Sequence, residues 1–182
     1  MTFRVEPLPL SEIDDPELRD LVAEAEALGV PGSEFARIVA RTPIHAKPFL
    51  RAMMMSQTQG NVDHKLKEVI RILLARFAED PYFERLRSSK ARAEGLSEEV
   101  IDAGAGDYED SPLFSEAEKC ALRYADQMYL DASKVDADFY AELKTHFSEA
   151  EIMELGAFIA LQYGMQMFMR TLERTTSGKS DR

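Results

Sequence analysis

The chain has 182 residues, of which 45% are hydrophobic and 30% are charged, a composition typical of one globular domain. It carries 22 basic and 33 acidic side chains, so its formal net charge is −11. This charge argues against nucleic acid or an anionic membrane as a partner, because both would repel the protein. Cys120 is the only cysteine, which excludes an intrachain disulfide, a CxxC redox pair and a thiolate zinc site. We expect a single domain over residues 1–174 and a disordered polar tail over residues 175–182.

The N-terminus and the apolar segments predict neither a secretory signal nor a membrane span. The first residues, MTFRVEPLPLSEIDD, lack the basic start and apolar stretch of a secretory signal, so we expect a cytoplasmic protein. The longest uncharged stretch, residues 155–169, has 15 residues, fewer than the roughly 20 that cross a bilayer. We predict that this stretch forms a helix that is buried in the protein or at a subunit interface.

The first 60 residues contain the start and stop signals of three helices. Asp15 precedes Pro16, a combination that caps and opens a helix, and Gly29 ends it. A short second helix is expected over residues 33–41 and a third over residues 43–59, the latter opened by another proline.

The strongest periodic pattern lies in residues 63–78. Its apolar residues fall at i, i+3, i+4, i+7, i+8 and i+11, which predicts one continuous buried stripe on a helix: Leu66, Val69, Ile70, Leu73, Leu74 and Phe77. Glu68 lies on the opposite face of this helix, together with Ile72 and Ala75. A carboxylate therefore shares a face with two apolar side chains.

The second half of the chain reads as further helices joined by a polar connector. Pro81 opens a helix that we expect to continue to Gly95, and Ser97 caps a short one after it. Residues 97–118 hold eight acidic side chains and no basic one, as in an exposed connector. Helix starts are expected at a capping aspartate and at two capping boxes: Asp136, Ser115 with Glu118, and Ser148 with Glu151. About eight helices and no strand predict an all-α bundle, held by helices 63–78 and 148–172.

Residues 66–103, with the sequence LKEVIRILLARFAEDPYFERLRSSKARAEGLSEEVIDA, resemble a known superfamily of all-α proteins, the carboxymuconolactone decarboxylase and AhpD-like (alkylhydroperoxidase D) proteins. A polar connector and a helix with the sequence FSEAEKCALRYADQM follow in the order found in that family. The likeness covers about residues 10–172. It implies an AhpD-like helical bundle that forms a homo-oligomer, a trimer or a hexamer.

The resemblance also places the family's catalytic positions on this chain. In the peroxidase branch these positions hold a glutamate, two cysteines of a CxxC motif and a histidine, and here they hold Glu68, Asp80, Phe83 and Arg87. Peroxide reduction by that branch needs a thiolate and a resolving thiol, which Asp and Phe cannot supply. The resemblance therefore implies a divergent member that lacks the thiol chemistry.

Glu68 has two interpretations. An apolar neighbourhood raises the pKa of a carboxyl group, so Glu68 could serve as a general acid or base. Alternatively, it belongs to a solvated or ion-paired edge with Lys65, Arg76 and Glu79.

The other candidate residues also have a structural and a functional interpretation. Asp80 precedes Pro81, which favours a helix N-cap, whereas a position close to Glu68 would split the pKa values of the two carboxyls. Arg87 could pair with Glu68, Asp80 or Glu84, or it could anchor a substrate carboxylate in bidentate fashion. Tyr82 and Phe83 would line the same site, or belong to the core. The functional interpretation makes Glu68, Asp80 and Arg87 catalytic and Arg87, Tyr82 and Phe83 substrate-binding, all in one semi-buried pocket.

The remaining chemistry-bearing residues predict no metal and no cofactor. The three histidines, His45, His64 and His146, have no His or Cys partner at helical spacing, and Asp63, His64 and Glu68 form one weak metal-like grouping. The methionines at 53–55 and at 165, 167 and 169 are typical of adaptable packing or a subunit interface.

Two functions remain open. The first is a cofactor-independent acid–base enzyme of the carboxymuconolactone decarboxylase type, a decarboxylase or isomerase that acts on a small anionic organic compound. The second is a family member without catalysis that persists as an oligomeric binding or regulatory protein, and an alkylhydroperoxidase is a distant third. A ligand-sized pocket at Glu68 and Arg87 would favour the first, and a filled core there would favour the second.

Overall fold

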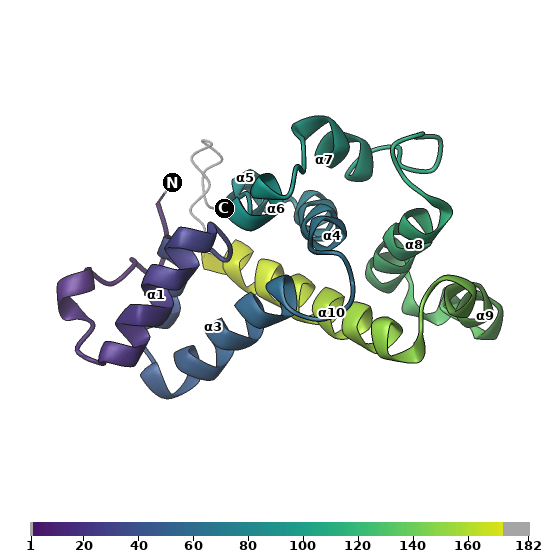
Figure 1. Ribbon diagram of the computed structural model, residues 1–182. Helices are drawn as coiled ribbons and strands as arrows, with labels where there is room; N and C mark the ends of the chain where they lie inside the picture. The colour runs from purple at the N-terminus through teal and green to yellow at the C-terminus, as the bar shows by residue number, and fades with distance from the viewer. Residues whose placement is uncertain (1, 173–182) are drawn as a thin grey trace, which may run out of the picture.

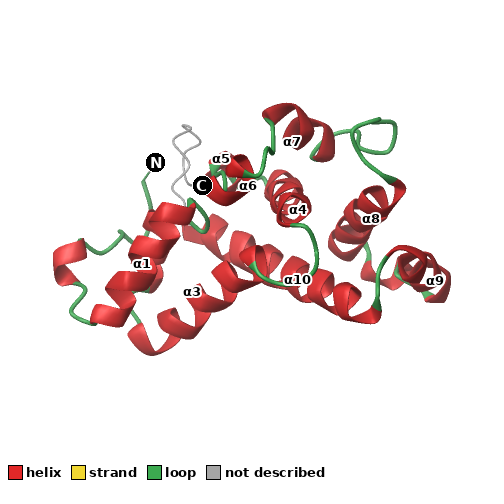
Figure 2. Cartoon of the chain, in the orientation of Figure 1, coloured by secondary structure: helices red, strands yellow, loops and turns green. Residues whose placement is uncertain are grey.

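The structure is a computed structural model that describes residues 2–172, and these residues form an all-α bundle without a β-strand (Figures 1 and 2). Two short 3-10 helices, Leu10–Glu12 and Ala132–Lys134, accompany ten α-helices. The α-helices are α1 (Pro16–Leu28), α2 (Ser33–Val39), α3 (Pro43–Thr58), α4 (His64–Phe77), α5 (Pro81–Arg85), α6 (Ser89–Ala93), α7 (Glu98–Gly104), α8 (Glu116–Leu130), α9 (Ala137–His146) and α10 (Glu149–Leu172). The predicted fold class is confirmed, and the tail predicted at residues 175–182 lies outside the described residues.

Helices α4 and α10 hold the bundle together. In Figure 1, α10 runs along the length of the molecule, with α1 and α3 near one end and α8 and α9 near the other, while α4 lies in the centre. One apolar cluster joins α4 to α7, α8, α9 and the first half of α10, and a second joins α1, α2 and α3 to α5. Every residue of α4 from Leu66 to Ala75 is buried, so the middle of this helix has no solvent face.

The predicted helix starts are confirmed by the capping hydrogen bonds. Asp15 accepts a hydrogen bond from the backbone N–H of Leu18, and Asp136 accepts two at the start of α9. Both capping boxes are present: the two serine hydroxyls accept from the N3 backbone amides, and the N3 glutamates accept from the serine amides. Such caps satisfy backbone donors that have no partner within the helix.

The prediction of one helix from Pro81 to Gly95 is wrong. The helix stops after Arg85, and Leu86 is extended with ψ 149° before Ser88 caps the separate helix α6. The break frees the carbonyl of Leu86 and the amide of Ser88 from helical hydrogen bonds. Both groups bind side chains of α4, as described below.

The uncharged stretch 155–169 is buried on one face only. Leu155, Phe158 and Ile159 lie in the core, whereas Met167 and Phe168 are exposed. Within the described residues, no helix is long and apolar enough to span a membrane.

Candidate functional site

A buried ion pair on α4 occupies the position where the sequence predicted a catalytic carboxylate. Glu68 and Arg71 are one helical turn apart and are both 0% exposed. The guanidinium of Arg71 donates from Nε to Glu68 Oε2 and from Nη2 to Glu68 Oε1, each at 2.8 Å. This is a bidentate pair, the strongest geometry for a carboxylate and an arginine.

The remaining capacity of the Glu68 carboxylate is used by two more donors. The backbone amide of Ser88 donates to Oε1 at 2.7 Å, and the side-chain amide of Gln57 donates to Oε2 at 2.9 Å. Each carboxylate oxygen therefore accepts two hydrogen bonds. The four hydrogen bonds therefore fill the acceptor positions of this buried carboxylate.

Arg71 explains why the chain breaks between α5 and α6. Its Nη1 donates to the carbonyl of Phe83 at 2.6 Å, and its Nη2 donates to the carbonyl of Leu86 at 2.8 Å. These carbonyls would otherwise need partners further along a continuous helix. The guanidinium donates the hydrogen bonds that backbone amides would donate in a continuous helix. It also supplies the positive charge that pairs with Glu68.

A histidine and a serine extend the network towards α3 and α6. His64 Nε2 is hydrogen-bonded to Ser88 Oγ at 2.8 Å, and His64 Nδ1 to the backbone carbonyl of Gln57 at 2.5 Å. The same Ser88 hydroxyl accepts from the Ala91 amide and so caps α6. A serine beside a histidine can be a nucleophile, but Ser88 is 0% exposed and its hydroxyl holds two structural contacts.

A second ion pair ties α4 to α10 and to the loop before α4. Lys67, which is 0% exposed, lies 2.5 Å from Glu154 and donates to the carbonyl of Gln59 at 2.6 Å. Glu154 also accepts from the amides of Asn61 and Val62. Burial alone would raise the pKa of Glu154, but these hydrogen bonds from Lys67 and the loop hold it below the usual value.

Asp80, Tyr82 and Phe83 lie close to this network but are engaged in structural contacts. Asp80 Oδ1 accepts from the amides of Tyr82 and Phe83, so the predicted N-cap is present. The Tyr82 hydroxyl accepts from the Phe35 amide at 3.0 Å and donates to the carbonyl of Pro31, and burial raises its pKa. Phe83 is fully buried in the N-terminal apolar cluster. The predicted catalytic role of Asp80 and the predicted substrate-binding roles of Tyr82 and Phe83 stay predictions.

The predicted pairing of Arg87 with Glu68, Asp80 or Glu84 is wrong. Arg87 follows the end of α5, and its guanidinium pairs with Glu98 at the start of α7, at 2.9 Å. Arg87 Nη1 also donates to the carbonyls of Glu84 and Leu86, and the Leu86 carbonyl is shared with Arg71. The cation that contacts the Glu68 carboxylate is Arg71. Glu68 lies in the second turn of α4 and pairs with Arg71, whereas Asp80 lies beyond the end of α4 and caps α5. The carboxylate partner of Arg87 is Glu98.

Replacing Arg87 by glutamine tests this assignment. Hydrogen bonds from Arg87 and Arg92 lower the pKa of Glu98 to about 2, so Arg87→Gln should raise it towards its ordinary value. Because the folded-state pKa is lowered, the contribution of Glu98 to stability is present above about pH 4.5 and is lost as the pH falls towards 2. An NMR titration of the Glu98 carboxyl measures the change. An unchanged pKa would contradict the pairing.

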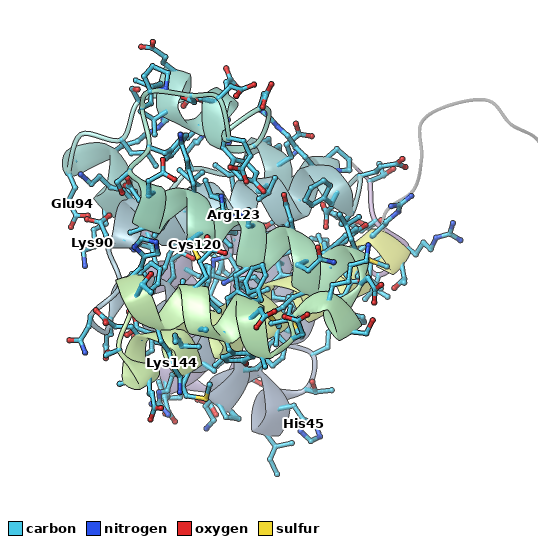
Figure 3. All side chains as sticks on the ribbon, turned by 90° about the vertical axis from the view of Figure 1, so that its right-hand side faces the viewer. His45, Lys90, Glu94, Cys120, Arg123 and Lys144 are labelled. Atoms are coloured by element: carbon cyan, nitrogen blue, oxygen red, sulfur yellow. The ribbon has the colours of Figure 1, made fainter. Side chains whose placement is uncertain are left out.

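Cys120 lies inside α8 and cannot replace the missing CxxC pair. It is fully buried, and burial raises the pKa of its thiol, which lowers the fraction of reactive thiolate. Figure 3 labels Cys120 and, one turn further along α8, Arg123. We expect no dithiol-dependent hydroperoxidase activity, and no catalytic change in Cys120→Ser. Peroxide turnover that disappears in this variant would contradict the expectation.

Arg71, Lys67, Gln57 and Ser88 were not among the predicted site residues. The spacing of Glu68 and Arg71 at i and i+3 on the helix was a usable signal, because oppositely charged residues one turn apart face each other. Gln57 and Ser88 gave no such signal, since they come from other parts of the chain.

Within residues 2–172, no group of three or more His, Cys, Asp or Glu side chains could hold a metal ion.

No protein-family model matches the chain. A curated relative, the uncharacterized protein YnjA of Escherichia coli (strain K12), is 35% identical over 72 residues, which are 40% of this chain and 38% of that protein. The matched segment thus spans well under half of the relative's length.

Solved structures extend the likeness over almost the whole fold. The debrominase Bmp8 superposes with a TM-score of 0.77 at 21% identity, over 92% of this chain and 88% of that one. Bmp8 has also been solved in complex with 2,3,4-tribromopyrrole. A peroxidase-related protein with an AhpD core, from Ralstonia eutropha JMP134, gives a TM-score of 0.75 at 15% identity, over 92% and 90% of the two chains. These likenesses confirm the AhpD-like fold that the sequence resemblance implied.

Proposed function

We propose that this protein binds a small organic molecule and carries out no acid–base chemistry at Glu68. The supporting observation is the closed environment of the carboxylate, which is 0% exposed and accepts hydrogen bonds from Arg71, Gln57 and Ser88. A general base must come within hydrogen-bonding distance of the proton that it removes. Glu68 has neither a free acceptor position nor contact with solvent.

Opening this site for a substrate would be costly. A substrate that reached Glu68 would have to displace at least one of its donors. Displacing Arg71 would leave a guanidinium unpaired in the core, and breaking a buried pair in this way costs about 3–5 kcal/mol. The core at Glu68 is filled by protein side chains, which favours a binding role over an acid–base enzyme.

The second candidate is an enzyme of the decarboxylase or isomerase type. It is supported by the position of Glu68, which matches the family's glutamate, and by the fold neighbour that has been solved with a small halogenated ring compound. In that case the anchor for a substrate carboxylate would be Arg71 rather than Arg87, because Arg71 is the cation beside Glu68.

Ligand-observed NMR separates the two candidates. The purified protein is mixed with a panel of small carboxylic acids, lactones and phenols, and each mixture is followed for several hours. Binding without conversion supports the proposal. Conversion by the wild type that is lost in a Glu68→Gln variant with an unchanged circular dichroism spectrum would overturn it in favour of the enzyme. A panel without any binder would also count against it.

The predicted homo-oligomer stays part of this proposal. Large apolar side chains outside any described pocket wall are exposed on α3, with Ile44 at 78% and Met55 at 50%, and Met153 on α10 is 60% exposed. An interface between subunits would cover such exposed apolar side chains. We expect a trimer or hexamer by light scattering at micromolar concentration. A monodisperse monomer near 20.6 kDa would contradict this expectation.

A further inference from the structure

An apolar pocket of about 350 Å³ lies away from Glu68, between the N-terminal segment, α2, the first turns of α3 and the end of α10. Its walls are apolar side chains that come from all four segments: Val5, Ile38, Val39, Ala46, Phe49, Phe168 and Leu172. Small-molecule sites have volumes of roughly 300–1,000 Å³ and apolar walls with a few polar groups. The pocket meets both conditions at the lower end of the size range.

The polar groups of the pocket gather where α2 gives way to α3. Arg41, Thr42 and His45 are the polar residues in its lining, and they lie within one helical turn of each other. Figure 3 shows His45 at the margin of the molecule, where the first turn of α3 meets solvent. The amino end of a helix adds a partial positive charge to this rim.

Arg41 is the one arginine or lysine among the residues that line the pocket. Its Nε and Nη2 both donate to one backbone carbonyl, that of Glu6. Within residues 2–172 it has no carboxylate partner, whereas Arg51 on α3 pairs with Glu17. A chain with a net charge of −11 thus keeps an arginine without an acidic partner at the rim of an apolar pocket.

We propose that this pocket binds a small monocarboxylic acid with an apolar body, a fatty or aryl-alkanoic acid of about ten heavy atoms. The apolar body lies among Ile38, Phe49 and Phe168, and the carboxylate is bound by Arg41 and His45 at the rim. A guanidinium binds a carboxylate with charge-assisted hydrogen bonds, and the exposed rim leaves Arg41 and His45 accessible to a ligand from solvent. The inference deepens the proposed binding function, because it names the ligand class and the place.

The test compares octanoate with octan-1-ol, which has the same number of carbon atoms and no charge. We expect the wild type to bind octanoate at least about tenfold more tightly than octan-1-ol, the gain that about 1.4 kcal/mol gives. Arg41→Gln should remove this difference. Arg51→Gln removes the same charge from α3 at a residue outside the pocket and should leave the affinity for octanoate within about twofold.

Two further measurements locate the ligand. The amide signals of residues 38–49 should shift on addition of octanoate, and Val39→Trp, which fills the pocket with an indole ring, should abolish binding of both probes while the far-UV spectrum stays helical. Binding that is unchanged in Arg41→Gln and Val39→Trp would overturn the pocket but leave a binding function elsewhere. Chemical conversion of a bound carboxylate would overturn the proposed function and leave the pocket standing.

Discussion

Replacing Glu68 by glutamine is expected to lower the free energy of unfolding by about 3–5 kcal/mol, because the change leaves the buried guanidinium of Arg71 without its counter-charge. Glutamine preserves the size of the side chain, so the loss reports the ion pair rather than a cavity. For a chain of this length, each 1 kcal/mol corresponds to roughly 2–4 °C in Tm. Urea unfolding followed by circular dichroism measures the effect directly.

A double-mutant cycle with Arg71→Met serves as the control. The single change Arg71→Met also removes the donors to the carbonyls of Phe83 and Leu86, so it should cost at least as much as Glu68→Gln. The loss of unfolding free energy in the double variant should be smaller than the sum of the two single losses by about 2 kcal/mol or more, because Glu68 and Arg71 interact directly. A loss below about 1 kcal/mol in Glu68→Gln would mean that water reaches the carboxylate, and it would return Glu68 to the list of catalytic candidates.

The sequence predicted most of the fold because its signals are local. Helix starts depend on residues within one turn, such as Asp136 and Ser148, and the apolar stripe of residues 63–78 depends on one helix alone. The break between α5 and α6 has a different origin. Its cause is Arg71, which is 12 residues before Phe83 and 15 before Leu86 along the chain and contacts them only in the folded structure.

The candidate site was predicted in part for the same reason. The position of Glu68 on the face away from the main stripe follows from helical spacing, and the position of Asp80 follows from the proline after it. Arg87 was placed by extending a helix that the protein does not continue. Gln57 and Ser88 are 11 and 20 residues away from Glu68 along the chain. A single sequence does not show that residues so far apart are in contact.

Gly29 packs directly against the backbone of Arg87, next to this site. We expect Gly29→Ala to lower the free energy of unfolding by about 3 kcal/mol or more. Gly29 ends α1 in the left-handed region, with φ +82°. An added Cβ would lie 2.3 Å from the carbonyl oxygen of Arg87, a backbone atom that cannot rotate away. The left-handed conformation alone costs a non-glycine residue about 1–2 kcal/mol, and the contact adds to that cost.

Gly95→Ala is the matched control. Gly95 also adopts the left-handed region, with φ +93°, but an added Cβ there would have no heavy atom within 4 Å. Its replacement should therefore cost only the conformational part, about 1–2 kcal/mol. Urea unfolding measures the loss of unfolding free energy in both variants. Equal losses would show that residues 86–89 can move away from α1 without an energetic cost.

The clash in Gly29→Ala should also weaken the Glu68–Arg71 ion pair. The Arg87 carbonyl that the new Cβ would displace lies between the Leu86 carbonyl and the Ser88 amide, which both bind the pair. Leu86 supplies a carbonyl to Arg71 and Ser88 supplies an amide to Glu68, on either side of Arg87. If Gly29→Ala shifts this segment, part of the network is already lost before Glu68 is changed. The losses of Gly29→Ala and Glu68→Gln should then be less than additive. If the two losses of unfolding free energy were strictly additive, only the Arg87 carbonyl would move in Gly29→Ala. In that case α1 would not help to position the groups that donate to Glu68.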